Sequence, residues 1–280
     1  MNILITGAQG FVGQHLLEEL NKSGHRTFPS SRSNLHGYLK LDVQQPSQML
    51  SIFDELEIGV VVNLAWHTSG VDYLNSPANN EALAWNREFF KVVRESSIRK
   101  IVSVGSSAEY AVEEAGTVIS AELDWLYATS KAAAHRSFVD TFNSSDIDFV
   151  WLRLFQVYGP GQPSQRFIPT LCDHIRHNRL LSLTNPNAVR DWIDVRDVAI
   201  SIRHIVESAT EREMDIGTSH GLSNFDICKY AREHFDLNWE VATPLIERGP
   251  ISLVADRNSP SFKYFKPSKN LFEYLNRSLS

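Results

Sequence analysis

Three side chains in the middle of the sequence could together move a proton at a carbonyl group. Tyr127 and Lys131 are four residues apart in a segment with a helical pattern, so they would share one face of that helix. A buried ammonium beside a phenol favours the phenolate, so we expect Lys131 to lower the pKa of Tyr127 from about 10 toward neutrality. Such a phenol can donate and accept protons near working pH. Ser106, at the end of the preceding predicted strand, could hold a carbonyl oxygen.

A second group of residues, at the start of the chain, could bind phosphate. Residues 2–6 have the pattern of a short apolar strand, and glycines follow at positions 7, 10 and 13. Glycine lets a backbone turn tightly and approach a pyrophosphate, whose charge is favoured at a helix N-terminus. A simple turn is the alternative, but the place between a strand and an amphipathic helix predicts a dinucleotide-phosphate site. This loop also argues against a chance surface pair of Tyr127 and Lys131.

The residues that follow the next predicted strand indicate which dinucleotide binds. An NAD site usually has an acidic residue about 20 positions on, which holds the ribose 2′-hydroxyl. Residues 28–33 read FPSSRS and contain no acid. Ser31 and Arg32 could bind a 2′-phosphate, so we expect NADP(H) rather than NAD(H), unless Arg32 is a solvated loop cation. Asp42 could accept from the adenine amino group, or it is a plain turn aspartate.

A scaffold for these residues follows from the alternation of strand-like and helical segments. The predicted strands are 2–6, 26–29, 38–41, 59–65, 100–105, 147–154 and 214–217, and the predicted helices are 12–23, 47–57, 80–97, 124–142 and 194–208. Such alternation predicts an α/β fold, a Rossmann-type doubly wound parallel sheet with ligands beyond the carboxyl ends of its strands. The pattern becomes irregular from about residue 159. We therefore predict an NAD(P)-binding domain over 1–158 and 191–217, and a smaller substrate lobe over 159–190 and 218–280.

Composition sets the remaining limits. The 280 residues are 42% hydrophobic and carry a net charge of −6 without a basic run, which argues against nucleic-acid binding. Cys172 and Cys228 lack metal-binding spacing, so we expect neither a zinc site nor a disulfide framework. We expect no membrane span, because no apolar run reaches about 18 residues. The first strand begins at the N-terminus and leaves no room for a signal peptide, so we expect a cytoplasmic protein.

Five motifs together resemble one family, the extended short-chain dehydrogenase/reductases of the NAD-dependent epimerase/dehydratase type, which modify nucleotide sugars. Residues 6–13, TGAQGFVG, are similar to the family's TGxxGFxG, residues 63–65, NLA, to its NxA, and residues 127–131, YATSK, to its YxxxK. Residues 152–161, LRLFQVYGPG, resemble LRxxNxYGPG, and residues 190–199, RDWIDVRDVA, resemble RDxxxVxDVA. The last two are the most specific, because plain short-chain dehydrogenases lack them. The resemblance covers nearly the whole chain.

The resemblance implies a role for each matching residue. Ser106, Tyr127 and Lys131 would be the catalytic triad, with Ser106 preferred to Ser107 because the family's hydroxyl sits four residues before a loop tyrosine, here Tyr110. The expected cofactor-binding residues are Gly7, Gln9, Gly10, Phe11, Val12, Gly13, Ser31, Arg32, Asp42, Val43, Leu64, Ala65, Trp66, Val104, Tyr127, Lys131, Phe155 and Val157. The expected substrate-binding residues are Ser107, Gln156, Arg166, Phe167 and Arg190.

Several of these roles have a plain alternative. Gln156 stands where the family usually has an asparagine facing the sugar-nucleotide diphosphate, which lengthens the reach. Arg190 would contact the nucleotide phosphates, a task suited to a guanidinium, or else it pairs with a neighbouring aspartate at 191 or 194. Phe167 belongs to the substrate lobe or to its core. His67 follows Trp66 where a cleft wall is expected, although an ordinary exposed histidine is the alternative.

The residues after the catalytic hydroxyl separate the reactions of the family. The 4,6-dehydratases resemble S/T-D-E or S/T-x-E there, whereas Ser107 and Ala108 occupy these positions here and Glu109 comes one place too late. A dehydratase is disfavoured unless the loop turns Glu109 into the cleft. We expect NADPH-dependent reduction of the C4 ketone of a nucleotide-linked 4-keto-6-deoxy sugar. The alternatives are a 4-epimerase with tightly bound NAD and a non-catalytic nucleotide-binding protein, against which the intact triad argues.

The resemblance also implies a homodimer. Helices 80–97 and 124–142 would pair across a two-fold axis as a four-helix bundle. The small side chains at positions 128 and 132–134, all alanine, would allow close approach of the helices, or they pack on their own sheet.

Overall fold

A parallel sheet of seven strands forms the centre of the computed structural model, which describes residues 1–68, 70, 72–112, 125–179, 181–183, 185–237 and 252–279. Its elements are β1 (Asn2–Thr6), α1 (Phe11–Lys22), β2 (Arg26–Ser31), β3 (Leu39–Lys40), α2 (Pro46–Glu55), β4 (Val60–Asn63), α3 (Ala78–Arg94), β5 (Lys100–Ser106), the 3₁₀ turn η1 (Ser107–Ala111), α4 (Leu126–Phe142), β6 (Asp148–Leu154), α6 (Val195–Ser208) and β9 (Glu213–Ile216). The strand order is β3-β2-β1-β4-β5-β6-β9.

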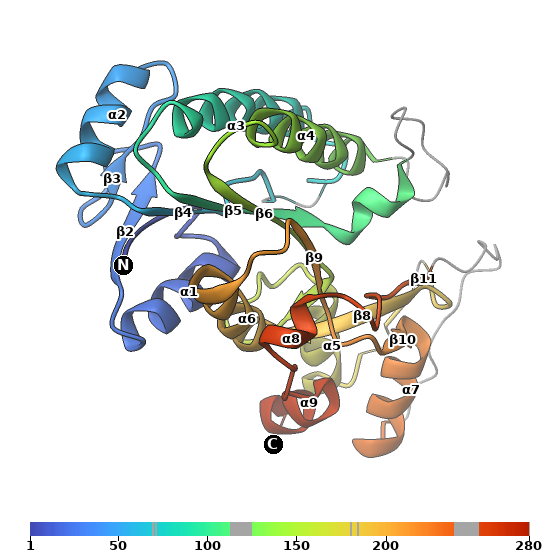
Figure 1. The fold of residues 1–280 in the computed structure, drawn as a ribbon. Coiled ribbons are helices and arrows are strands. Elements are labelled where there is room, and N and C mark those ends of the chain that lie inside the picture. Colours follow the sequence, from blue (N-terminus) through green and yellow to red (C-terminus); the bar gives the residue numbers. More distant parts are fainter. Residues whose placement is uncertain are drawn as a thin grey trace.

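Helices cover both faces of this sheet. In Figure 1, α3 and α4 lie over one face, and α1 and α6 lie over the other. Successive strand residues point to opposite faces, and both kinds are apolar here, as expected for a buried parallel sheet. The predicted class, a Rossmann-type doubly wound sheet, is confirmed. Residue 124, at the start of one predicted helix, lies outside the described residues, and α4 begins at Leu126.

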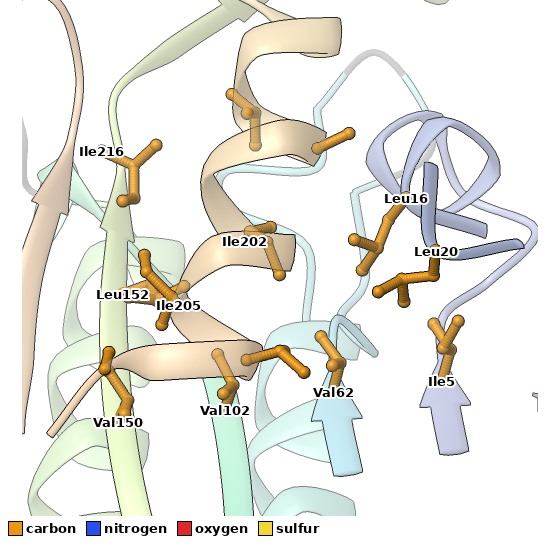
Figure 2. Packing of buried hydrophobic residues seen from close by; sticks show 14 of the residues in the cluster. Ile5, Leu16, Leu20, Val62, Val102, Val150, Leu152, Ile202, Ile205 and Ile216 are labelled. Carbon is orange, nitrogen blue, oxygen red and sulfur yellow. The ribbon is translucent and has the colours of Figure 1, made fainter. Parts of the chain in front are cut away.

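The hydrophobic core under α1 and α6 anchors the amino-terminal loop. Ile5 of β1 is fully buried against Leu16 of α1, and Ile202 of α6 belongs to the same cluster. Figure 2 shows these side chains together with Val102 at the middle of the sheet. Burying a side chain of this size contributes about 1.5–3 kcal/mol, so the strand, the loop and the helix are held as one unit.

A second, smaller sheet takes up much of the part that looked irregular in sequence. The elements in and around it are β7 (Gln156–Tyr158), α5 (Phe167–Arg176), β8 (Val189–Asp194), β10 (Gly221–Ser223), α7 (Asn224–His234), β11 (Ser252–Leu253) and α9 (Leu271–Leu279). Between β11 and α9, helix α8 (Ser261–Tyr264) packs on α6 and β9 of the first sheet. Strand β8 is central, parallel to β7 and β11 and antiparallel to β10. A separate core, which includes Ile168, Trp192 and Ile227, lies beneath it.

The predicted elements change at this second sheet. No strand was expected at 189–194, and the boundary at 190/191 assigned most of it to the nucleotide-binding domain; the structure pairs it with β7 instead. The predicted division into domains remains a prediction, but the second sheet includes residues from both sides of its boundaries. None of the helices in the described part of the chain is both long and apolar enough to cross a membrane.

Candidate active site

The turn after β1 approaches β4 so closely that it requires glycine. Gly7 has a φ of +68°, and a Cβ at this position would lie 2.8 Å from the carbonyl carbon of Leu64. The N–H of Gly10 donates to the carbonyl of Gly7 at 2.9 Å, which closes the turn. Gly10 is the N-cap of α1, whose first turn carries no acidic residue and no side-chain cap. Its free N–H groups therefore suit a phosphate.

A cavity of about 560 Å³ opens beyond the carboxyl ends of β1, β2 and β4. It is lined by Thr6, Gly7, Gln9, Gly10, Ser30, Ser31, Arg32, Ser33, Leu41, Leu64, Ala65, Trp66, His67 and Thr68, and by five residues of α3, Ala78, Glu81, Ala82, Trp85 and Asn86. The structure thus brings the glycine loop, the hydroxyl and guanidinium groups after β2, and the end of β4 around one space. These groups fit a dinucleotide, with backbone N–H groups for its pyrophosphate.

Other predicted cofactor residues lie outside this lining. Phe11, Val12 and Gly13 form the first turn of α1, and the Phe11 ring packs edge-on against His15 at 6.0 Å. The carboxylate of Asp42 accepts from the Gln44 N–H at 2.9 Å within its own turn, as a plain turn aspartate would. The expected contacts to adenine remain a prediction. Three further residues of this group pack inside the protein: Val43 on the core under α3, Val157 on the core under α6, and Phe155 against Tyr110.

The proposed triad meets at the carboxyl end of β5. Ser106 is the last residue of that strand, and a hydrogen bond links its hydroxyl to Tyr127 in the first turn of α4. Lys131 follows one helical turn later. Its Nζ donates to the carbonyl of Val104 at 2.8 Å and lies 4.0 Å from the centroid of the Trp66 ring. The three side chains therefore face the same strand end, as their chemistry requires.

The protonation of the triad differs from the expectation. Burial raises the pKa of Tyr127 above the usual value of a phenol, and the hydrogen bond to Ser106 offsets this only in part. Burial also lowers the pKa of Lys131 to about 7. The predicted lowering of the Tyr127 pKa by Lys131 is thus wrong for the chain without cofactor. Desolvation of the phenol is the largest cause of the rise, and the ammonium of Lys131 donates to the carbonyl of Val104.

Two residues that frame Tyr127 come from segments distant in sequence. The ring of Tyr73 packs edge-on against that of Tyr127 at 5.5 Å. The guanidinium of Arg166 lies 4.0 Å above the Tyr73 ring and donates to the Thr68 carbonyl at 2.9 Å. Arg166 was expected near the substrate from the resemblance. Tyr73 was not expected, because a single aromatic residue in a loop carries no spacing that marks it.

None of the remaining predicted substrate residues lines the cavity described above, and all but Ser107 lie in or beside the second sheet. Gln156 pairs with Trp192 across β7 and β8, and the ring of Phe167 lies 5.6 Å from that of Trp192. Arg190 is the second residue of β8 and donates to the carbonyl of Val189 at 2.9 Å. Ser107 begins η1, directly after the triad serine. Their contacts to a substrate remain predictions.

Comparison with known proteins shows which family of enzymes has this arrangement of residues. The sequence model of the NAD dependent epimerase/dehydratase family matches residues 3–217, which include the glycine loop and the whole triad. The chain belongs to this family. The resemblance noted in the sequence is therefore confirmed, and with it the expectation of an NAD(P)-dependent enzyme.

Individual members of the epimerase/dehydratase family show how widely the chemistry of this fold varies. A CDP-abequose synthase of Salmonella typhimurium is 24% identical over 81% of this chain and 79% of its own length. A dTDP-6-deoxy-L-talose 4-dehydrogenase (NAD(+)) of Aggregatibacter actinomycetemcomitans is 21% identical over 74% of this chain and 81% of its own. The structure of a UDP-glucose 4-epimerase from Thermotoga maritima superposes with a TM-score of 0.81, at 18% identity, over 100% of this chain and 97% of that one.

Glu109 decides whether this family member has the acid of a dehydratase in its cleft. The side chain is 4% exposed, and its oxygens accept from the Ser106 N–H at 2.6 Å and from the Trp151 indole N–H at 3.0 Å. The carboxylate therefore lies inside the protein, between β5 and the Trp151 side chain. The condition under which a dehydratase was expected, Glu109 in the cleft, is not met.

Proposed function

We propose that this protein uses NADPH to reduce the C4 ketone of a nucleotide-linked 4-keto-6-deoxy sugar. The observation that carries the proposal is the end of the cavity at β2. Ser31, Arg32 and Ser33 line it, and the hydroxyl oxygens of Ser31 and Ser33 lie 3.2 Å apart. Hydroxyls and a guanidinium suit a 2′-phosphate, whereas an NAD site usually places a carboxylate there. The relative that acts as a 4-dehydrogenase on a dTDP-6-deoxy sugar supports the choice of position on the sugar.

Each triad residue has a defined task in this reaction. When bound, NADPH supplies the hydride. Ser106 holds the ketone oxygen by a hydrogen bond, and Tyr127 gives its proton to that oxygen as the hydroxyl forms. Because burial raises the pKa of Tyr127, the phenol is protonated at neutral pH, which is the form that a proton donor needs. Lys131 binds the ribose beside the nicotinamide and orients Tyr127.

A 4-epimerase with tightly bound NAD is the second candidate, and the likeness to the Thermotoga maritima enzyme favours it. Both reactions use the same triad, but an epimerase returns its hydride and consumes no cofactor. Denaturing the purified protein and identifying any released nucleotide separates the two. Little nucleotide and a clear preference of the apo-protein for NADPH over NADH in a titration would support the reductase. Tightly retained NAD would contradict it and leave the epimerase.

Turnover then tests the proposal directly. A panel of 4-keto sugar nucleotides is mixed with NADPH, and the fall in its absorbance is followed. We expect stoichiometric loss of NADPH with one of them. If turnover leaves the cofactor unchanged, the epimerase gains support. No turnover of any sugar nucleotide would favour the non-catalytic alternative.

We also propose the homodimer through α3 and α4. Two of the alanines expected to allow close approach, Ala128 and Ala134, are fully buried within the chain and therefore pack on its own core. Ala133 remains partly exposed on α4. We expect sedimentation to give the mass of a dimer, and Ala133→Arg to shift it toward a monomer with an unchanged circular dichroism spectrum. A wild-type monomer at micromolar concentration would contradict the interface.

A further inference from the structure

The carboxylate of Glu109 is buried next to the triad, against the backbone of β5 at Gly105 and Ser106. Its Oε1 accepts from the N–H of Ser106 and its Oε2 from the indole N–H of Trp151. The guanidinium Nε of Arg153 lies 3.3 Å from Oε2. These three groups are donors, which suits the ionised form of the carboxylate, and His135 Nδ1 lies 3.6 Å from Oε2 as a fourth polar neighbour.

This carboxylate and the ammonium of Lys131 approach neighbouring residues of β5. Lys131 Nζ donates to the carbonyl of Val104. At the next residue, Gly105, a Cβ would overlap both Oε1 of Glu109 and the indole nitrogen of Trp151. Glycine at this position is what allows the carboxylate to lie against the strand. The two opposite charges are thus held against one short stretch of backbone, residues 104–106.

We propose that Glu109 is a positioning residue that fixes the backbone of Ser106 and keeps a negative charge behind Lys131, so that the ammonium remains charged beside Tyr127. The inference rests on the proposed Ser–Tyr–Lys function. It adds to the triad a residue that touches neither substrate nor cofactor. It also explains why a carboxylate lies in the core at a point where an apolar side chain would cost less.

The charged and polar groups around this pair come from four elements. Lys131 is faced by the Trp66 ring, and burial lowers its pKa to about 7 while the charge of Glu109 opposes that shift. Burial raises the pKa of Glu109, and Arg153 of β6, His135 of α4 and Lys131 oppose this. Three contacts connect this network to β9: Arg153 to Glu213 at 2.9 Å, His135 to Glu213 at 3.2 Å, and Tyr110 to Asp215 at 2.7 Å.

The test measures the titration of Lys131 without substrate or cofactor. Protein labelled with ¹³C at the lysine side chain is titrated by NMR, and Lys131→Met identifies the signal. In Glu109→Gln the Lys131 pKa should fall by about one unit or more, because an opposite charge at close range is lost. Glu213→Gln removes a carboxylate from the outer end of the same network and should leave the Lys131 titration unchanged. A folded Glu109→Gln protein with the wild-type Lys131 titration would overturn the proposal.

A reciprocal measurement covers the case in which Glu109→Gln does not fold. Coupling between two sites is symmetric, so Lys131→Met must raise the Glu109 pKa by the amount that Glu109 raises that of Lys131. The Glu109 carboxyl signal is followed in protein labelled at glutamate. An unchanged Glu109 titration in Lys131→Met would overturn the proposal as well. Since neither measurement requires turnover, a protein that reduces no 4-keto sugar yet shows the shift would lose the proposed function and keep this inference.

Discussion

Replacing Tyr127 with phenylalanine should lower kcat for ketone reduction by about a thousandfold, within the range expected for losing a positioned general acid. The phenol is the group that gives its proton to the oxygen of the forming hydroxyl. Its ring packs edge-on against Trp66 and Tyr73 at 6.5 and 5.5 Å, and phenylalanine preserves both contacts. The fold and the affinity for NADPH should therefore remain. Single-turnover loss of NADPH absorbance measures the effect on the chemical step.

Tyr110→Phe is the matched control for this experiment. It removes a hydroxyl that donates to Asp215 at 2.7 Å, on a residue that is 46% exposed and outside the cavity lining. We expect kcat to stay within about threefold of wild type, because the lost hydroxyl bonds to Asp215 of β9 and not to a triad residue. A Tyr127→Phe enzyme that reduced the sugar at a near-normal rate would contradict the proposed mechanism.

Replacing Arg32 with glutamate should reverse the cofactor preference. The substitution removes a guanidinium from the β2 end of the cavity and places a carboxylate where a 2′-phosphate would lie. Charge-assisted hydrogen bonds to such a group contribute about 1.5–3 kcal/mol. NADPH affinity should consequently fall by about a hundredfold, while NADH, which offers a 2′-hydroxyl, binds as well as before or better. Titration of protein fluorescence with each cofactor measures both constants.

Arg26→Glu provides the same charge reversal at the opposite end of β2. Arg26 lies at the first position of the strand, stacked over the Phe28 ring at 4.9 Å, and does not line the cavity. We expect both cofactors to bind this variant as they bind wild type. Equal losses of affinity for NADPH and NADH in Arg32→Glu would mean that Arg32 contacts a part of the dinucleotide that both cofactors share. No loss for either would restore the reading of Arg32 as a solvated loop cation.

The parts of this fold that could be predicted are those whose signal is local. The strand before the glycine loop, residues 2–6, was predicted with its observed bounds because the glycine turn and the apolar run are adjacent in sequence. Tyr127 and Lys131 could be placed together because four residues on a helix fix a shared face. Strand β8 was missed because its partners lie far away in the chain, and because Asp191 and Asp194 interrupt its apolar pattern.

The features of the site that escaped prediction depend on packing. The pKa of Tyr127 was expected to fall, because a neighbouring lysine is visible in sequence whereas the extent of burial is not. Glu109 was considered only as a dehydratase acid, since its place behind β5 follows from Gly105 and Trp151. Tyr73 is held beside Tyr127 because the Tyr127 N–H donates to the carbonyl of the next residue, Leu74, at 2.8 Å. The sequence spacing of these residues does not predict this contact.

The fully buried aspartates of this chain make its two sheets inseparable as expression units. Asp191 of β8 accepts from the N–H groups of Thr218 and Ser219 and from that of Ala255. Asp197 of α6 accepts from the N–H groups of residues 268 and 269. A fragment that stopped at residue 217 would lose all of these donors, and with them Ile227, Leu271 and Leu275 of the second core. The seven-stranded sheet is thus tied to the C-terminal residues by these hydrogen bonds, and a chimaera that replaced residues 218–280 would have to supply matching donors for both aspartates.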